Sequence, residues 1–228
     1  MSVLAAKSVH FGPLKDVSCT FEYGRLYTVI GETGSGKTAL LSLLAGLAQP
    51  EKGEVTVQGE PLKRIGGVRH RRENVSLLLT SGGLFPTLTA LENVLYSLEM
   101  QGFSGKEIKK QAAALLDTVG ILGEDLRKRP RALTPGQRQR VAIARALAAP
   151  GRIILADEPT GDLDGESAEE IFGAFHRLVR WENYCVVLLT RDETAAHWAD
   201  VVYRLERGRL TRETAEPDRP DPLPEVYP

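Results

Sequence analysis

The chain has 228 residues, of which 42% are hydrophobic and 26% are charged, a balance typical of one soluble globular domain with a real core. No apolar run approaches the roughly 20 residues that a membrane-spanning helix needs, and residues 1–12 lack the apolar core of a signal peptide. The net charge of −1 argues against nucleic-acid binding, which usually requires a basic surface. We therefore expect a cytoplasmic protein that reaches a membrane only through a partner.

The first part of the chain alternates short β-type runs with turns. We predict strands at Val3–Val9, Val17–Phe21, Tyr27–Ile30, Val55–Val57 and Val75–Leu79, and an apolar helix at Lys37–Leu47. A basic cluster precedes the last of these strands and comprises Lys63, Arg64, Arg69, Arg71 and Arg72. We interpret this cluster as a solvated connection, with a docking patch for an acidic partner as the alternative.

The middle of the chain changes to helical periodicity between Thr89 and about Gly120. The apolar residues that recur on one helical face are Leu91, Val94, Leu95 and Leu98. We predict two helices there, broken near Gly102–Gly105, and another helix from Pro135 to about Ala148. A helical subdomain therefore occupies roughly residues 81–135.

Strands and helices alternate again in the last part of the chain. We predict strands at Ile153–Ala156, Cys185–Leu189 and Val201–Leu205, and helices at Glu166–Arg180 and Glu193–Ala199. The run Ile153–Ala156 is wholly apolar, as a buried parallel strand should be. This alternation predicts an α/β fold with a parallel core sheet.

One domain is expected over residues 1–212, followed by a tail at 213–228. The tail is rich in proline and acidic residues and has little to bury, so we predict that it is disordered. Cys19 and Cys185 both lie in apolar strand-like runs. Buried thiols are therefore a better interpretation than a disulfide or a metal site.

A phosphate-binding loop lies between the third strand and the first helix. Its residues match G-x-x-x-x-G-K-S/T and are Gly31, Glu32, Thr33, Gly34, Ser35, Gly36, Lys37 and Thr38, followed by Ala39 in the helix. Glycines let backbone N–H groups converge on phosphate oxygens, and the helix N-terminus adds a partial positive charge. We expect Lys37 to reach the β- and γ-phosphates and Thr38 to hold Mg²⁺. The loop alone does not separate kinases, GTPases and transport ATPases.

Two carboxylates end the apolar strand at Ile153–Ala156. Asp157 is placed to bind Mg²⁺ through water, and Glu158 is placed to polarise an attacking water as a general base. A strand that merely runs into a polar turn is the alternative. The presence of a phosphate loop upstream favours the catalytic interpretation.

The combined motifs resemble the ATP-binding-cassette (ABC) ATPases. The resemblance covers about residues 3–210 and rests on the phosphate loop, on LTPGQRQR at 133–140 and on ADEPTGDLD at 156–164. The run LFPTLTALENV at 84–94 is similar to the branch that serves lipoprotein release, macrolide export and antimicrobial-peptide resistance. The resemblance implies a mostly parallel core sheet, an antiparallel β subdomain and a helical subdomain.

The resemblance also implies a head-to-tail dimer of cassettes beneath a membrane permease, with ATP and Mg²⁺ between the subunits. The partner cassette is a second copy or a different chain. Residues 133–137, which we call the signature segment, would face the γ-phosphate on the opposite subunit through Thr134, Gly136 and Gln137. Asp164 would cross the interface. Phe11 is expected to stack on adenine, with a core position as the equal alternative.

Three positions depart from the family pattern. Thr80 stands where a glutamine normally contacts Mg²⁺ and the attacking water, and its side chain is shorter. Pro135 stands in the signature segment; it is tolerated at the first helical position but has no N–H to give a phosphate. Arg191 replaces a histidine that contacts the γ-phosphate, and it either pairs with a nearby carboxylate or reaches the phosphate as a cation.

The sequence therefore predicts ATP binding with slow hydrolysis that drives a permease. The alternative is a non-hydrolysing, ATP-gated regulatory cassette paired with a complete one. Soluble ABC proteins of DNA repair or translation carry tandem cassettes or long coiled-coil insertions, and neither appears in this sequence. A small-molecule kinase would have no use for the signature segment.

Overall fold

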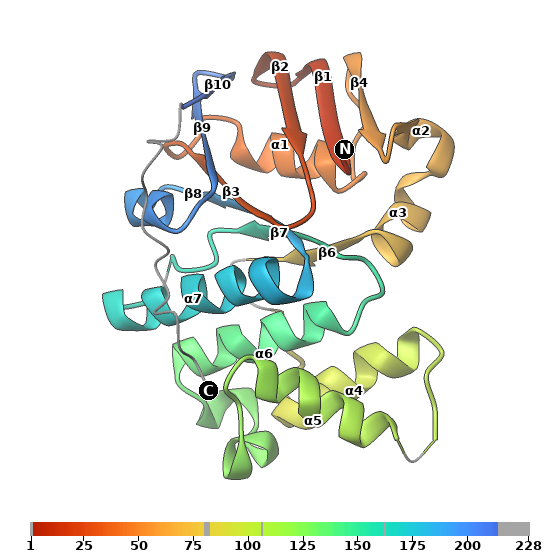
Figure 1. Cartoon of the computed structure of the whole chain (residues 1–228), viewed down its shortest axis with the longest axis vertical. Coiled ribbons are helices and arrows are strands. Elements are labelled where there is room, and N and C mark those ends of the chain that lie inside the picture. Colours follow the sequence, from red (N-terminus) through yellow and green to blue (C-terminus); the bar gives the residue numbers. More distant parts are fainter. Residues whose placement is uncertain (1, 80–82, 106, 162, 214–228) are drawn as a thin grey trace.

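Two β-sheets and a group of helices make up the fold, which a computed structural model describes for residues 2–79, 83–105, 107–161 and 163–213 (Figure 1). The larger sheet has the strand order β10-β9-β3-β8-β7-β6. Its strands are β3 (Arg25–Ile30), β6 (Val75–Leu78), β7 (Ile153–Asp157), β8 (Cys185–Thr190), β9 (Val201–Glu206) and β10 (Arg209–Arg212). All neighbours are parallel except β9 and β10. The predicted parallel α/β core is confirmed.

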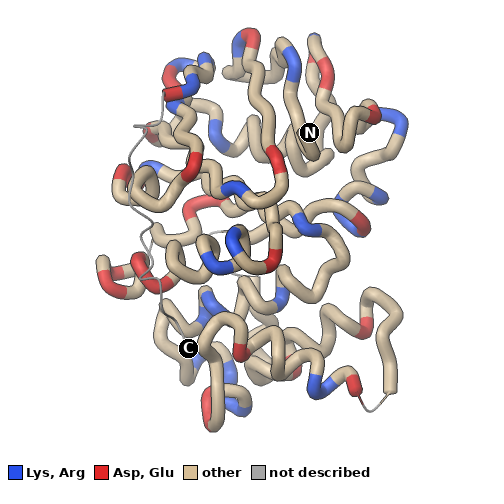
Figure 2. Tube along the Cα trace, viewed as in Figure 1, with Lys and Arg blue, Asp and Glu red and all other residues tan. Residues whose placement is uncertain are grey.

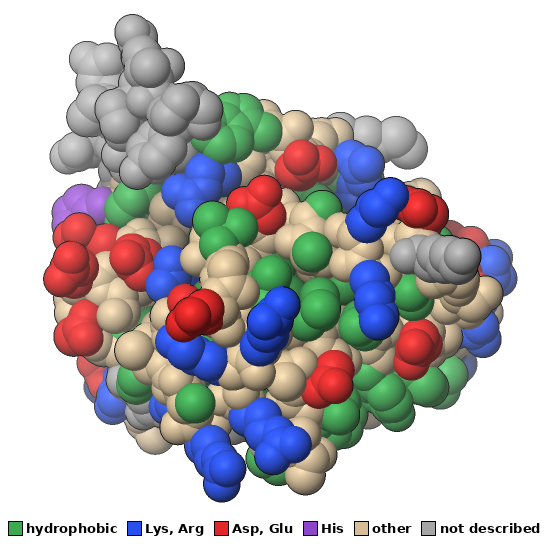
Figure 3. All heavy atoms as spheres, turned by 90° about the horizontal axis from the view of Figure 1, so that it is seen from below, with side chains coloured by type: hydrophobic (Ala, Val, Ile, Leu, Met, Phe, Trp, Pro, Cys, Tyr) green, Lys and Arg blue, Asp and Glu red, His purple; other side chains and the backbone are tan. Residues whose placement is uncertain are grey.

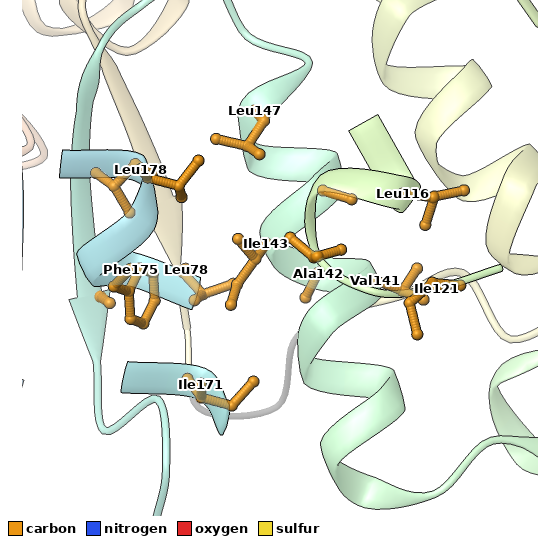
Figure 4. Close-up of a cluster of buried hydrophobic side chains, with 14 of the residues drawn as sticks. Leu78, Leu116, Ile121, Val141, Ala142, Ile143, Leu147, Ile171, Phe175 and Leu178 are labelled. Carbon is orange, nitrogen blue, oxygen red and sulfur yellow. The ribbon is translucent and has the colours of Figure 1, made fainter. Parts of the chain in front are cut away.

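The central strands of the larger sheet are buried on both faces, and alternate residues of β7 and β8 enter different cores. Ile154 and Leu188 pack into one cluster with α6 (Pro135–Leu147) and α7 (Gly165–Glu182). Figure 4 shows side chains of these helices meeting Leu78 of β6. The neighbouring residues along the same strands enter a second cluster with α1 (Lys37–Leu44). The apolar runs of β7 and β8, which end in one polar residue each, are therefore explained by burial on two sides.

The smaller sheet is antiparallel and covers α1 (Figure 1). It runs in the order β2-β1-β4-β5. Its strands are β1 (Leu4–Phe11), β2 (Leu14–Phe21), β4 (Lys52–Val57) and β5 (Glu60–Pro61). Helix α1 is thus enclosed between the two sheets, because its buried leucines share one core with residues of both. The predicted antiparallel subdomain is confirmed.

Helices at the other end of the molecule form the predicted helical subdomain (Figure 1). They are α4 (Ala90–Met100), α5 (Ile108–Thr118) and the 3₁₀ helices η1 (Gly123–Arg127) and η2 (Pro130–Ala132). Helix α4 begins at Thr89 with a capping box, in which Thr89 and Glu92 exchange hydrogen bonds. None of the helices in the described part of the chain is long and apolar enough to cross a membrane.

The basic cluster is more ordered than a simple solvated connection. It lies on two short helices, α2 (Leu62–Ile65) and α3 (Gly67–Glu73). Arg71 donates to the carbonyl of Gly46 at 2.7 Å, and Arg69 pairs with Glu73 one turn away. Figure 2 shows Lys and Arg interspersed with Asp and Glu along the trace. Lys63, Arg64, Arg69 and Arg72 are exposed, as a solvated connection requires. The two helices were not predicted, because helices of four and seven residues give little periodicity to read.

Other element predictions differ from the structure in smaller ways. The predicted helix Glu193–Ala199 is a 3₁₀ helix, η3 (Glu193–His197), since one short turn leaves no room for α-helical bonds to propagate. Strand β10 was not predicted. Cys19 and Cys185 are both free and buried, as expected. Most of the predicted tail, from residue 214 onward, lies outside the described residues.

Candidate nucleotide-binding site

The phosphate loop joins β3 to α1 in the strand–turn–helix arrangement that the motif requires. Gly36, just before α1, has φ 114°, which a residue with a side chain rarely adopts. A Cβ added at Gly36 would lie 2.8 Å from Leu14 Cδ2. The first N–H groups of α1 have no carbonyl of the preceding turn to bond. They are therefore available to phosphate oxygens.

A cavity of about 400 Å³ lies in front of this loop. Its lining residues are Pro13, Glu32, Thr33, Gly34, Gly36, Lys37, Thr38, Ala39, Asp157 and Glu158. Residues more than a hundred positions apart in the chain thus meet at the carboxyl ends of β3 and β7, where open α/β sheets bind ligands. The structure brings together the phosphate loop and both predicted carboxylates. Gly31 and Ser35 belong to the same loop but are buried behind it.

Lys37 is held at the centre of this cavity. Its side chain is only 8% exposed, and Nζ lies 3.2 Å from Glu158 Oε1. The ammonium also donates to the backbone carbonyls of Gly31 and Glu32. A buried ammonium is stable only when its donors are paired. Glu158 and the two carbonyls provide that pairing.

Glu158 is fixed through its other carboxylate oxygen and through its backbone. The Thr190 hydroxyl donates to Oε2 at 2.9 Å, and the backbone N–H of Arg191 donates to it at 3.2 Å. The backbone of Glu158 has φ 47°, a left-handed conformation that is uncommon outside glycine and clusters at functional sites. Glu158 is therefore placed by β8 as well as by its own strand.

Asp157 is the carboxylate that fits a cation. It is half-buried, and burial together with the nearby Glu158 raises its pKa, against the effect of Lys37. A divalent cation would relieve this cost, and Mg²⁺ prefers oxygen ligands such as the Asp157 carboxylate and the Thr38 hydroxyl. No cluster of three or more His, Cys, Asp or Glu side chains suited to a metal occurs among the described residues. This donor set fits Mg²⁺ that takes its remaining ligands from phosphate and water.

The signature segment does not take part in this cavity. Thr134 and Gln137 form a capping box at the start of α6, and Gln137 Nε2 also donates to Asp125 at 2.8 Å. Gly136 lies against Ser167 at the start of α7, where Asp164 accepts from the Ser167 N–H as the helix cap. The predicted Thr134, Gly136, Gln137 and Asp164 thus lie close together, but apart from the phosphate loop of the same chain.

Three further predicted residues have different outcomes. Thr80 lies outside the described residues. The guanidinium of Arg191 is exposed and makes no hydrogen bond or ion pair with the part of the chain that the structure describes, so the predicted partner carboxylate is not found there. Phe11 ends β1 and packs against the core around α1. It is not among the lining residues of the cavity, and its contact with adenine stays a prediction.

The sequence reasoning missed Thr190 and Asp125. Thr190 is fully buried and is the one polar residue at the end of an otherwise apolar strand. A buried hydroxyl needs a partner, so this position could have been flagged. Asp125 carries no comparable signal, because it is a half-buried residue of a short 3₁₀ helix with no apolar pattern around it.

Comparison with known proteins decides the family. A family model described as "ABC transporter" matches residues 14–161. The chain belongs to the ABC transporter family. An ABC transporter ATP-binding protein of Bacillus subtilis, YclH, is 38% identical over 197 residues, which covers 86% of this chain and 87% of that protein. The lipoprotein-releasing system ATP-binding protein LolD of Hydrogenovibrio crunogenus is 39% identical over 185 residues, 80% of each chain.

Solved structures agree with this cassette fold. The ATP-binding cassette MJ0796, in a dimeric post-hydrolysis state bound to ADP and Pi, superposes with a TM-score of 0.82 at 30% identity. The match covers 93% of this chain and 99% of that one. The ABC cassette fold, with a mixed core sheet, an antiparallel subdomain and helices, is therefore confirmed.

Proposed function

We propose that this cassette binds Mg²⁺-ATP in the cavity at the phosphate loop, hydrolyses it slowly as one half of a cassette dimer, and drives a membrane permease. The observation that carries this proposal is the convergence of Lys37, Asp157 and Glu158 in one cavity in front of a helix N-terminus. Thr38 and Asp157 would hold Mg²⁺, which would supply positive charge to offset that of the phosphate groups.

ATP binding would change the partner of Lys37. Its ammonium is shared with Glu158 at 3.2 Å, and the β- and γ-phosphates offer it a stronger, doubly charged partner. Glu158 Oε1 is then free to accept a proton from a water molecule. The water oxygen attacks the γ-phosphorus, the bond from that phosphorus to the β-bridging oxygen breaks, and ADP and inorganic phosphate leave.

Slow hydrolysis follows from the three altered positions. Pro135 has no N–H to donate, and Arg191 presents an exposed guanidinium, without a partner among the described residues, in place of an imidazole. Thr80 has a shorter side chain than glutamine. Loss of one preorganised transition-state donor typically costs on the order of 10²–10³ in rate. The individual losses need not multiply, because residues that act as a unit are not additive.

The partners that we propose are a second cassette and a permease of the export or extraction type. We infer the second cassette from the position of the signature segment, which lies apart from its own chain's cavity, and from the dimeric state named for MJ0796. The export direction follows from similarity to LolD, a protein named for lipoprotein release. Binding to a permease would place the cassette on the inner face of the cell membrane.

The helical subdomain offers an apolar surface for that permease. Figure 3 shows hydrophobic side chains exposed on the face seen from below. Around α4, Phe85, Tyr96, Met100 and Phe103 are each at least 41% exposed, and the rings of Phe85 and Tyr96 are 4.9 Å apart. Exposed apolar groups of this kind mark protein–protein contacts.

Titration calorimetry with Mg²⁺-ATP, combined with a steady-state hydrolysis assay, tests the proposal. We expect saturable binding and a low turnover that Glu158→Gln abolishes while binding persists. A turnover equal to that of a relative with all motifs intact would contradict slow hydrolysis, and absence of binding would contradict the proposal as a whole.

The non-hydrolysing regulatory cassette remains the second candidate, favoured by the same three altered positions. It requires a complete cassette as partner. Permease activity supported by a non-hydrolysable ATP analogue would favour this candidate, whereas activity that stops with the analogue would favour the hydrolysing cassette.

A further inference from the structure

Thr190 is the last residue of β8 and contacts both the phosphate loop and Glu158. Strand β8 sits between β3 and β7 in the larger sheet. The carbonyl of Thr190 accepts a hydrogen bond from Gly31, the first residue of the phosphate loop, at 3.1 Å. Its side chain is fully buried. It does not line the cavity, so any role in catalysis is exerted through a neighbour.

The hydroxyl of Thr190 has a fixed direction. The backbone N–H of Asp192 donates to its oxygen at 3.0 Å, and the hydroxyl donates to Glu158 Oε2 at 2.9 Å. A hydroxyl has one proton to donate and two lone pairs. Because Asp192 occupies a lone pair, the single proton is directed to Glu158.

Glu158 is consequently held at three points by the end of β8. Its backbone N–H donates to the carbonyl of Leu189 at 2.8 Å. Its Oε2 accepts from the Thr190 hydroxyl and from the Arg191 N–H. Only Oε1 is directed to Lys37 and the cavity. The two oxygens of this carboxylate therefore have separate tasks.

We propose that Thr190 is the positioning residue for Glu158, and that its hydroxyl keeps Oε1 directed at the phosphate cavity after Lys37 transfers to the nucleotide. The inference rests on the proposed function, in which Glu158 is the general base. While Lys37 is bound, it also orients Oε1. Once the ammonium has moved to phosphate, the bonds to Oε2 are what remains to stop the carboxylate from rotating.

Hydrolysis assays on two variants test this role. Thr190→Val keeps the shape of the side chain but removes the hydroxyl, and Thr190→Ser keeps the hydroxyl. Misplacement of a catalytic group by about 1 Å costs on the order of 10²-fold. We expect kcat to fall roughly 10- to 100-fold in Thr190→Val, with the Kd for ATP unchanged within about twofold. Thr190→Ser should recover most of the rate.

Thr28→Val is the matched control. Thr28 is also fully buried on a strand of the same sheet, and its hydroxyl donates to the carbonyl of Ala195 at 3.3 Å. Thr28→Val should lower thermal stability about as much as Thr190→Val and leave kcat unchanged. Equal losses of kcat in both valine variants would overturn the inference, since a purely structural role predicts that result.

Crystal structures of the variants with a non-hydrolysable ATP analogue bound, in which Lys37 is engaged by phosphate and no longer holds Glu158 Oε1, provide a test that is independent of turnover. We expect the Glu158 carboxylate to keep its position in Thr190→Ser and to rotate in Thr190→Val, with Oε2 no longer facing the end of β8. An unmoved carboxylate in Thr190→Val would overturn the inference. If the wild-type chain binds ATP without any hydrolysis, the proposed hydrolytic function fails, and these structures still decide the role of Thr190.

Discussion

The phosphate loop and the signature segment satisfy their polar groups in different ways. At the phosphate loop, Lys37 and Glu158 meet from distant parts of the chain, and both line a cavity. In the signature segment, Thr134 and Gln137 bond to each other, and Gln137 also donates to nearby Asp125. The two regions also pack on opposite faces of the larger sheet, since α1 and α6 belong to different cores.

This difference shows which part of the site one chain can build. The phosphate loop, Asp157 and Glu158 form a cavity without help from another molecule. The signature segment has a well-capped helix N-terminus, and its residues do not line the cavity at the phosphate loop of the same chain. One chain should therefore bind nucleotide by itself and need a second cassette for the groups that face the γ-phosphate.

Removal of the Lys37 ammonium is the most severe test of the phosphate-loop region. Loss of one partner from a buried charge pair costs about 2 kcal/mol or more. We therefore expect Lys37→Ala to weaken ATP binding at least about 30-fold, measured by titration calorimetry. Lys52→Ala, which changes an exposed lysine of β4, is the control and should bind normally. Equal affinity in Lys37→Ala and the wild type would show that the cavity is not the nucleotide site.

Substitution in the signature segment should have a different result. Gln137→Ala removes one half of the capping box and the bond to Asp125. Since Gln137 does not line the cavity, the Kd of a single chain for ATP should stay within about twofold. ATP-dependent association should weaken by roughly tenfold, which corresponds to about 1.4 kcal/mol, the size of one hydrogen bond. Sedimentation at several ATP concentrations measures the amounts of single and associated chains. A large fall in the affinity of the single chain for ATP would contradict the proposed difference between the phosphate loop and the signature segment.

Sequence patterns were sufficient for the features that depend on local or strongly repeated signals. The apolar strands and the phosphate loop were predicted because burial and phosphate chemistry each leave a clear pattern. Lys37, Asp157 and Glu158 were assigned from those patterns, and they do share a cavity.

Side-chain contacts between strands of the sheet could not be predicted from such local patterns. Thr190 and Glu158 lie 32 positions apart in sequence, and their bond depends on the order β3-β8-β7, which no single motif states. The helices α2 and α3 were missed for a different reason. Their stability comes from contacts such as that of Arg71 with Gly46, whereas short helices have little intrinsic stability.

A smaller effect is expected when the cap of α6 is removed. Thr134 accepts the N–H of Gln137 at 3.1 Å, and loss of such a cap costs about 1 kcal/mol. Urea denaturation should show this loss in Thr134→Ala and little change in Thr134→Ser. ATP affinity of the single chain should be the same in both. A fall in that affinity without a fall in stability would place Thr134 in its own chain's site.

The smallest effect is expected at the two cysteines, which lie in the core around α1. Burial raises the pKa of Cys19 to about 12 and also raises that of Cys185. Near neutral pH both thiols are below their pKa and protonated, and the thiol is far less reactive than the thiolate. We expect no labelling by a thiol reagent at pH 8, with or without ATP, and labelling of both in denaturant. Rapid labelling of the native chain would show that this core opens readily.

The central claim is that the chain holds ATP with a complete set of groups and hydrolyses it slowly because three groups that face the γ-phosphate are altered. The most direct measurement is kcat and the Kd for Mg²⁺-ATP in a variant that combines Thr80→Gln, Pro135→Gly and Arg191→His. We predict that kcat rises on the order of tenfold or more while the Kd stays within about threefold of the wild type. An unchanged kcat, with the variant folded and binding ATP normally, would contradict the account.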